Sequence, residues 1–304
     1  MPEISGPPEV IVDPEYGYRR LDPLPLDDEL DTFYQSAYLD MIRTGQRFPE
    51  SRRLLTPGPE ADGERAWLRA TLHADILDAL TTHLSTGDRS VLDIGAGIGE
   101  FVASATADGW SAIGLEPSRE AVAIAESMGR SVVCATLEGY IDAGGPTSPL
   151  GAVVLTNVLE HVLQPVDLLH TIRATLPVGG LLVVRVPNDF NPLQAAAQAA
   201  LGLEPWWIAV PDHVNYFDHA SLRLVVESCG FEVVDQWGDF PMEFFLLMGD
   251  DYITDPALGR ACHERRQRLE LRMDPTARRA FARSLVDLGW GRNTVVVARA
   301  RPSA

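Results

Sequence analysis

The chain has 304 residues, 46% of them hydrophobic and 22% charged, which predicts one large α/β domain with an appendage or two small domains. Its formal net charge of −18 argues against a nucleic-acid partner, because phosphate binding draws on basic surface. All 25 basic residues are arginines, which excludes chemistry that needs a lysine amine.

The chain begins with an extension, residues 1–65, that is rich in Pro, Asp and Tyr and holds one predicted helix over residues 27–42. Its start lacks the charged-then-apolar order of a signal peptide. No apolar run approaches the ~20 residues needed to span a bilayer. Cys134, Cys229 and Cys262 are too far apart to indicate a disulfide framework or a CxxC zinc site. We therefore expect a cytoplasmic protein with no membrane span.

Strands and helices alternate from residue 89 to residue 187. Apolar strands are predicted at residues 90–95, 111–116, 131–136, 151–157 and 179–187, and helices at residues 100–109, 118–129 and 166–176. Ser118 and Gly129 supply the N-cap and the stop of the second helix. Short apolar strands joined by such helices imply right-handed crossovers and a parallel sheet covered on both faces.

The rest of the chain completes and flanks this core. A long lid, residues 188–218, precedes a helix at 220–230 and a strand at 231–238, and a helical insertion, residues 241–291, precedes the last strand at 293–300. The expected fold is α/β, with a doubly wound (Rossmann-like), mostly parallel, seven-stranded sheet. Residues 66–240 and 292–304 form its core. Ligands of such sheets bind beyond the carboxyl ends of the strands.

The segment "SVLDIGAGIGEF", residues 90–101, indicates which ligand binds there. A dinucleotide fingerprint would continue from Gly95 and Gly97 to a third glycine, but Glu100 stands in that position. A carboxylate in the first helical turn repels phosphate, and Asp93 adds a second negative charge. These charges favour a cationic ligand without phosphate, namely S-adenosylmethionine. Glu116 ends the second strand, where its carboxylate can accept both ribose hydroxyls.

Five segments, "VLDIGAGIGEF", "GLEPS", "TLEGY", "TNVLEHVLQP" and "LPVGGLLVVRVPN", resemble in order and spacing the motifs of class I S-adenosylmethionine-dependent methyltransferases. The likeness is greatest to the group that includes the ubiquinone-biosynthesis O-methyltransferases and many glycan and natural-product enzymes. It covers residues 88–240 and the last strand. The flanks, such as "PWWIAVPDHVNYFDHASL", resemble more loosely the methyltransferases of polysaccharide biosynthesis.

The resemblance assigns roles around the cofactor. Asp93, Gly95 and Gly97 would hold its methionine end, Glu116 with Pro117 its ribose, and Leu137 with Glu138 its adenine, while Asn157 would face the sulfonium. Ubiquinone-type enzymes carry an acidic residue before Glu-His that can bind a metal. Because Asn157 takes that acidic position, we expect no metal site.

Two of the seven histidines fall where an acceptor should bind. Histidine is the natural base for deprotonating a hydroxyl near neutral pH. His161 follows the fourth strand, and either catalysis or a structural role as a helix cap is open to it. His213, in the lid, is either the base or a residue that braces the lid by a hydrogen bond. The other five histidines are expected on the surface or in the core.

Residues of the lid are candidates for acceptor binding, each with a structural alternative. Trp206 and Trp207, with Phe190 and Tyr216, form an aromatic wall for a sugar or ring, or pack the lid onto the sheet. Asn188 and Asp189 bind acceptor hydroxyls or make an ordinary turn, and Asn215 flanks His213. Eight arginines between Arg260 and Arg283 are expected to form a solvated helical face rather than an anion site.

The sequence thus predicts a metal-independent methyltransferase that acts on a hydroxyl of a small molecule, sugar or glycan. Three alternatives stay open. They are N- or carboxylate methylation of a natural product, a non-catalytic scaffold that binds the cofactor, and an NAD-dependent enzyme. The sequence carries no signal for the oligomeric state.

Overall fold

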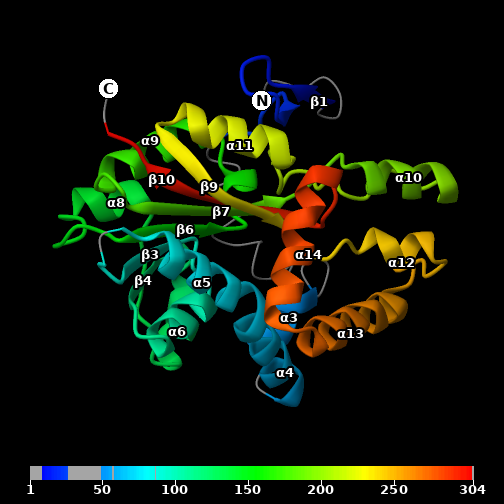
Figure 1. Cartoon of the computed structure of the whole chain (residues 1–304), viewed down its shortest axis with the longest axis horizontal. Coiled ribbons are helices and arrows are strands. Elements are labelled where there is room, and N and C mark those ends of the chain that lie inside the picture. The colour runs from blue at the N-terminus through cyan, green and yellow to red at the C-terminus, as the bar shows by residue number, and fades with distance from the viewer. Residues whose placement is uncertain (1–8, 27–48, 57, 86, 303–304) are drawn as a thin grey trace.

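The computed structural model describes residues 9–26, 49–56, 58–85 and 87–302 (Figure 1). The helix predicted over residues 27–42 lies outside these ranges. The main sheet has seven strands in the order β5-β4-β3-β6-β7-β10-β9. They are β3 (Ser90–Ile94), β4 (Ser111–Leu115), β5 (Val132–Val133), β6 (Ala152–Thr156), β7 (Leu181–Pro187), β9 (Phe231–Gly238) and β10 (Asn293–Ala300).

The sheet confirms the predicted fold class. β5, β4, β3, β6 and β7 pair in parallel, and β10 runs antiparallel to both β7 and β9. From β3 the chain builds outward through β4 to β5 and then returns to the other side of β3 for β6. The strand order therefore reverses between β3 and β6, the place where open α/β sheets bind ligands.

Helices cover both faces of the sheet. α9 (Pro165–Thr175) and α11 (His219–Ser228) pack on one face, and α5 (Ala74–His83) and α6 (Glu100–Ala107) on the other. α7 (Arg119–Ser127), α8 (Leu137–Asp142) and the 3₁₀ turn η3 (Leu159–His161) complete the crossovers. Alternate residues of β6 take opposite faces, so that Val153 joins the α9 side and Val154 the α5 side.

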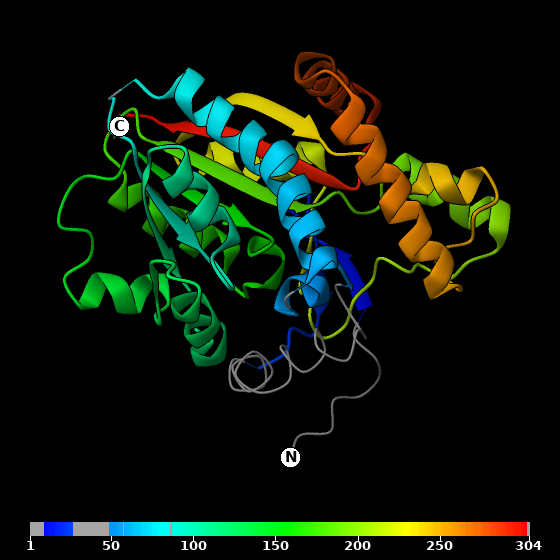
Figure 2. The ribbon, with the colours of Figure 1, turned by 90° about the horizontal axis from the view of Figure 1, so that it is seen from below.

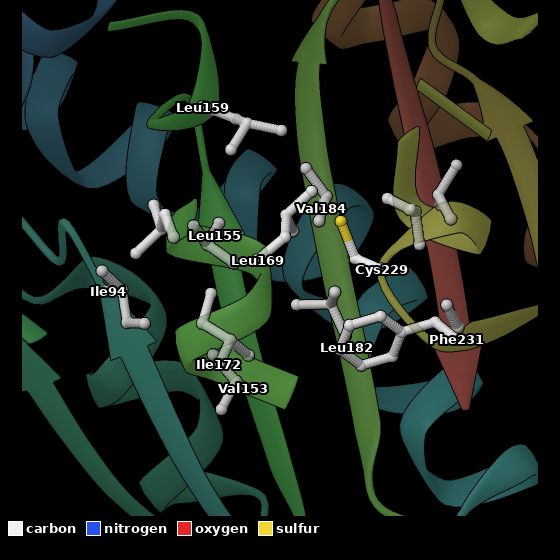
Figure 3. Packing of buried hydrophobic residues seen from close by; sticks show 14 of the residues in the cluster. Ile94, Val153, Leu155, Leu159, Leu169, Ile172, Leu182, Val184, Cys229 and Phe231 are labelled. Carbon is white, nitrogen blue, oxygen red and sulfur yellow. The ribbon is translucent and has the colours of Figure 1, made fainter. Parts of the chain in front are cut away.

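The α9 side of the core is continuous across the sheet (Figure 3). Leu155 of β6 and Val184 of β7 project toward Leu169 of α9, and Phe231 at the start of β9 closes the far end. Each of these four side chains is fully buried. This packing fixes the carboxyl ends of the strands, and with them the residues that follow each strand.

A second, three-stranded sheet joins the N-terminal segment to the lid. Its strands are β1 (Glu9–Val12), β2 (Arg19–Asp22) and β8 (Asn215–Tyr216), all antiparallel. Leu21, Val214 and Tyr216 form its buried core. The sequence did not predict this sheet, because strands of two to four residues carry too little periodicity and β2 pairs with β8 across almost two hundred residues of sequence.

Residues 241–291 contain α12 (Glu243–Leu247), α13 (Pro256–Arg272) and α14 (Pro275–Leu288). α13 packs against the segment formed by α4 (Pro59–Leu68) and the π-helical turn η2 (Arg69–His73), next to α3 (Pro49–Leu55) (Figure 2). Buried polar contacts join them. The Trp67 indole donates to Glu270 at 2.7 Å, and Nε2 of His263 lies 3.1 Å from Glu64.

The expectation that the arginines of residues 260–283 form a solvated face was wrong for two of them. Arg266 and Arg278 are only 4% and 7% exposed. Arg266 contacts Glu270 and Asp239, and Arg278 donates to Asp75 at 2.7 Å. They hold the insertion to the core, because a buried guanidinium requires carboxylate partners.

Two further expectations concern membrane spans and disulfides. Among the residues that the structure describes, no helix combines the length and the apolar character needed to cross a bilayer. Cys134, Cys229 and Cys262 are all free thiols.

Candidate active site

A cleft of about 1480 Å³ runs along the carboxyl ends of the central strands, where the strand order reverses. The turn after β3, the residue after β4 and the end of β6 form its floor, and η3, the lid, α12, α13 and α4 form its walls. Such a volume accommodates a nucleoside cofactor together with a second small molecule.

The turn after β3 has a conformation that only glycine adopts easily. Gly95, Gly97 and Gly99 have φ angles of 72°, 54° and 75°. A Cβ at Gly95 would overlap the side chain of Val158, whereas the position of a Cβ at Gly97 has no heavy atom within 4 Å. The turn therefore packs against η3 at Gly95 and leaves open space at Gly97, on the cleft.

Glu116 ties this turn to the end of β4. Its two carboxylate oxygens accept the amide protons of Gly97 at 2.9 Å and Ser118 at 2.8 Å. Each oxygen keeps a lone pair for a further donor. Asp93 is buried beside it, and burial together with the Glu116 charge raises the pKa of Asp93 to about 8. The predicted residues Asp93, Gly95, Gly97 and Glu116 thus meet on one wall of the cleft.

Glu100 does not present a free negative charge to this site. Its Oε1 is 3.0 Å from Nε of Arg65 and 3.0 Å from Nη1 of Arg130. The two guanidinium groups therefore offset the negative charge of Glu100, so this carboxylate does not by itself oppose a phosphate ligand. The acidic character of the turn comes from Asp93 and Glu116 instead.

Asn157, at the end of β6, lies on the cleft in a left-handed conformation with a φ of 58°. Its side-chain oxygen accepts a hydrogen bond from Arg185 of β7, whose other nitrogen is 2.9 Å from Asp239. The Arg185 and Arg266 guanidinium groups, outweighing the effect of burial, lower the pKa of Asp239. Neither Arg185 nor Asp239 was predicted, although an arginine inside the apolar strand "LLVVRVP" is a detectable signal.

The two predicted catalytic histidines lie together. The rings of His161 and His213 meet edge-on with centroids 4.9 Å apart, and both residues line the cleft. Nδ1 of His161 lies 2.8 Å from the carbonyl oxygen of Asp212 and 3.3 Å from its carboxylate. Nε2 of His161 lies 3.8 Å from Glu160. A hydrogen bond from the Val214 amide to the Glu160 carbonyl holds the lid against η3.

This arrangement sets the electrostatic environment of His161. Burial alone would lower the pKa of His161, but the Glu160 carboxylate and the contacts with Asp212 outweigh it and raise this pKa to about 9. Burial raises the pKa of Glu160 to about 7. His161 therefore carries a proton near neutral pH and cannot accept another.

Only part of the predicted acceptor site lines the cleft. Trp206, Trp207 and Asp189 do. Phe190 and Tyr216 pack behind them in the core of the small sheet, and the Tyr216 hydroxyl donates to the His213 carbonyl at 3.0 Å. The positions of Phe190 and Tyr216 therefore agree with the alternative that these rings pack the lid rather than contact the acceptor.

Asn188 and Asn215 make structural hydrogen bonds. Asn188 donates to the carbonyl groups of Gly289 and Gly291, which ties the end of β7 to the segment before β10. Asn215 donates to the carbonyl groups of Leu159 and Val162 in and after η3. Both side chains are almost fully buried, and both lie outside the cleft wall.

The predicted adenine residues lie beside the cleft. Leu137 is buried in the hydrophobic core at the start of α8, Glu138 is exposed, and Pro117 follows Glu116. None of these three belongs to the cleft wall. Their contacts with adenine stay a prediction.

Glu160, His161 and His213 also form the kind of group that can hold a metal ion, with one ligand atom from each within 4.8 Å of the others. Two features oppose this use. His161 is protonated near neutral pH, and Asn157, which stands where the resemblance implies an acidic ligand, accepts a hydrogen bond from Arg185. The expected absence of a metal stays a prediction.

The sheet order, the glycine turn and Glu116 define a class I S-adenosylmethionine-dependent methyltransferase. A family model described as a methyltransferase domain matches residues 64–236, more than half of the chain, so this protein belongs to that methyltransferase family. No curated protein sequence matches the chain.

Solved methyltransferase structures share the fold at low sequence identity. Magnesium protoporphyrin IX methyltransferase from Synechocystis PCC 6803, with bound S-adenosylhomocysteine, is 12% identical with a TM-score of 0.53, over 90% of this chain and 100% of that one. The 1,6-didemethyltoxoflavin-N1-methyltransferase of Burkholderia thailandensis is 13% identical with a TM-score of 0.52, over 97% and 100%. The plantazolicin methyltransferase is 12% identical with a TM-score of 0.51, over 90% and 94%.

Proposed function

We propose that this methyltransferase acts on a hydroxyl group of a small molecule, sugar or glycan, with His213 as the base. The observation that carries the proposal is the edge-on pair of His161 and His213 on the wall of the cleft. Methylation of a hydroxyl requires removal of its proton, which a positioned imidazole can accept. Transfer to a carboxylate would require no such base.

The cofactor side of the site is formed by Asp93, the glycine turn and Glu116. The lone pairs left on Glu116 suit the two ribose hydroxyls, and the open space at Gly97 admits the nucleoside. The Glu116 carboxylate lies near a ligand that carries a sulfonium and an ammonium group. When bound, S-adenosylmethionine supplies a methyl carbon that its sulfonium activates.

The two histidines have separate roles in this proposal. His213 accepts the proton of the acceptor hydroxyl as the oxygen forms its bond to the methyl carbon and the carbon–sulfur bond breaks. His161 is a positioning residue. Asp212 and Glu160 hold its imidazolium, and its ring orients that of His213 through the edge-on contact. We further propose that the lid and residues 241–291 close over the acceptor, with Trp206 and Trp207 against it.

The test is transfer of a labelled methyl group from S-adenosylmethionine to a panel of hydroxyl, amine and carboxylate acceptors, with the product identified by mass spectrometry and NMR. A methyl ether on the product supports the proposal. A methyl ester or methylamine as the only product would contradict it. Binding of the cofactor without transfer to any acceptor would instead favour the scaffold alternative.

A further inference from the structure

Two buried carboxyl groups on the acceptor side of the cleft lack partners for one oxygen each. Asp189 follows β7 and is 4% exposed, and Glu243 begins α12 and is 3% exposed. Both line the cleft. Within the part of the chain that the structure describes, Oδ2 of Asp189 and Oε2 of Glu243 have no hydrogen-bond partner. A buried polar oxygen without a donor is costly, and it indicates a site that a ligand completes.

The charges around this pair are mostly negative. Asp189 has the Gln194 side-chain amide as its neighbour at 3.4 Å, and its pKa is raised to about 8 by burial and by the charges of Glu160 and Glu243. Burial and the charge of Asp239 also raise the pKa of Glu243. The cations of Arg292 and Arg266 partly offset this increase. Burial and the two like charges raise the pKa of Asp189, and the hydrogen bond from Gln194 opposes them. The environment of the pair therefore favours a positively charged partner over a neutral one.

The pair lies away from the position of the cofactor. β7 is separated from β3 by β6, and adjacent strands are ~4.8 Å apart, so Asp189 is roughly 10 Å across the sheet from the glycine turn. α10 (Pro192–Leu201) begins three residues after Asp189 and packs against α12, which carries Glu243. The cofactor's ammonium group belongs at the turn, and this pair faces the acceptor side of the cleft.

We propose that the acceptor carries a protonated amine, which Asp189 and Glu243 bind, in addition to the hydroxyl that is methylated. This inference rests on the proposed function and narrows its substrate class to hydroxylated amines, of which amino sugars are one chemical type. An amine held as an ammonium ion has no lone pair to attack the methyl carbon. The pair therefore binds and orients the acceptor, and the hydroxyl nearer His213 is the nucleophile.

A first experiment requires no knowledge of the acceptor. Asp189→Asn and Glu243→Gln remove buried charge that has no partner, so at pH 8 each variant should raise Tm by roughly 2–4 °C, and by less at pH 5, where the carboxyl groups are already protonated. The matched control is Glu64→Gln. Glu64 is also buried, but it accepts from Arg53 and Gln267, so this variant should lower Tm. A lower Tm for Asp189→Asn and Glu243→Gln at pH 8 would contradict the inference.

A second experiment uses D-glucosamine, D-galactosamine and D-mannosamine, each paired with its N-acetyl derivative, which keeps the other ring hydroxyls but has no charge. Saturation-transfer NMR on the protein loaded with S-adenosylhomocysteine should detect at least one free amine and not its N-acetyl partner. Asp189→Asn and Glu243→Gln should weaken this binding at least ~10-fold and leave the affinity for S-adenosylhomocysteine unchanged.

The outcomes separate this inference from the proposed function. Equal binding of the N-acetyl sugars, no binding of any amine, or a matching loss of S-adenosylhomocysteine affinity in the two variants would overturn the inference alone. Methylation at nitrogen of a bound amine would overturn both. An amine that binds through the pair but yields no methyl ether with labelled S-adenosylmethionine would support the amine site and contradict the proposed function.

Discussion

His161 and His213 come from segments 52 positions apart, yet their rings meet edge-on with centroids 4.9 Å apart. The Asp212 carbonyl fixes the orientation of the His161 ring, and the Val214 amide holds the lid against Glu160. The environment of His161 keeps it protonated near neutral pH. A protonated His161 cannot accept the acceptor proton, which is why the proposed function gives that role to His213.

Replacing His213 with Gln should lower kcat on a hydroxyl acceptor by roughly 10²–10⁴ and remove the ionisation near neutral pH from the rate profile. His161→Gln should lower kcat by only about 10-fold and keep that ionisation, because His213 remains present but is held less firmly in position. His170→Gln, on the exposed surface of α9, is the control. Near-normal kcat in both His161→Gln and His213→Gln would rule out base catalysis by histidine.

Removal of metal ions should leave turnover unchanged. Within the Glu160, His161 and His213 group, His161 is protonated near neutral pH and contacts Asp212, and Asn157, where the resemblance implies an acidic ligand, accepts a hydrogen bond from Arg185. The measurement is the rate before and after dialysis against a chelator, together with the metal content of the protein. Loss of activity that a divalent cation restores, in step with one bound ion, would assign the group to metal binding.

The protein without ligands should lose stability between pH 7 and pH 9. Burial raises the pKa of both Asp93 and Asp189 to about 8. The folded state therefore holds protons that the unfolded state has released, and this advantage disappears as the pH rises through 8. Each such group lowers the unfolding free energy by up to about 1.4 kcal/mol per pH unit below pH 8, and this slope falls to near zero by pH 9. Thermal unfolding at several pH values measures the slope, which Asp93→Asn should reduce. A Tm that rises from pH 7 to pH 9 would contradict these assignments.

Trp207→Ala should raise the KM for the acceptor and leave the affinity for S-adenosylhomocysteine nearly unchanged. Trp207 lines the cleft from the lid, with its ring against those of Trp206 and Phe190. Leu201→Ala, on the exposed end of α10, is the control. Steady-state kinetics and calorimetry separate the two affinities. Equal loss of both, or loss of folding, would show that Trp207 only packs the lid.

The sequence predicted the fold because its strands and helices have clear periodicities, and it predicted the turn from Asp93 to Gly97 because these residues are adjacent in the chain. Glu116 could be placed because it ends the next strand. The neighbours of His161 could not, since Asp212 reaches it only through the folding of the lid. The contact of Arg185 with Asp239 and that of Arg266 with Asp239 likewise depend on β7, β9 and α13 meeting in three dimensions.

The most direct test of the account is calorimetric titration of S-adenosylhomocysteine into the protein and into Glu116→Ala. The intact protein should bind it with a micromolar Kd, and loss of the ribose hydrogen bonds to the Glu116 carboxylate should weaken binding by roughly 10²-fold. Glu126→Ala, exposed on α7, should bind as the intact protein does. Unchanged affinity in Glu116→Ala, or micromolar binding of NADH with none of S-adenosylhomocysteine, would contradict the assignment of this cleft.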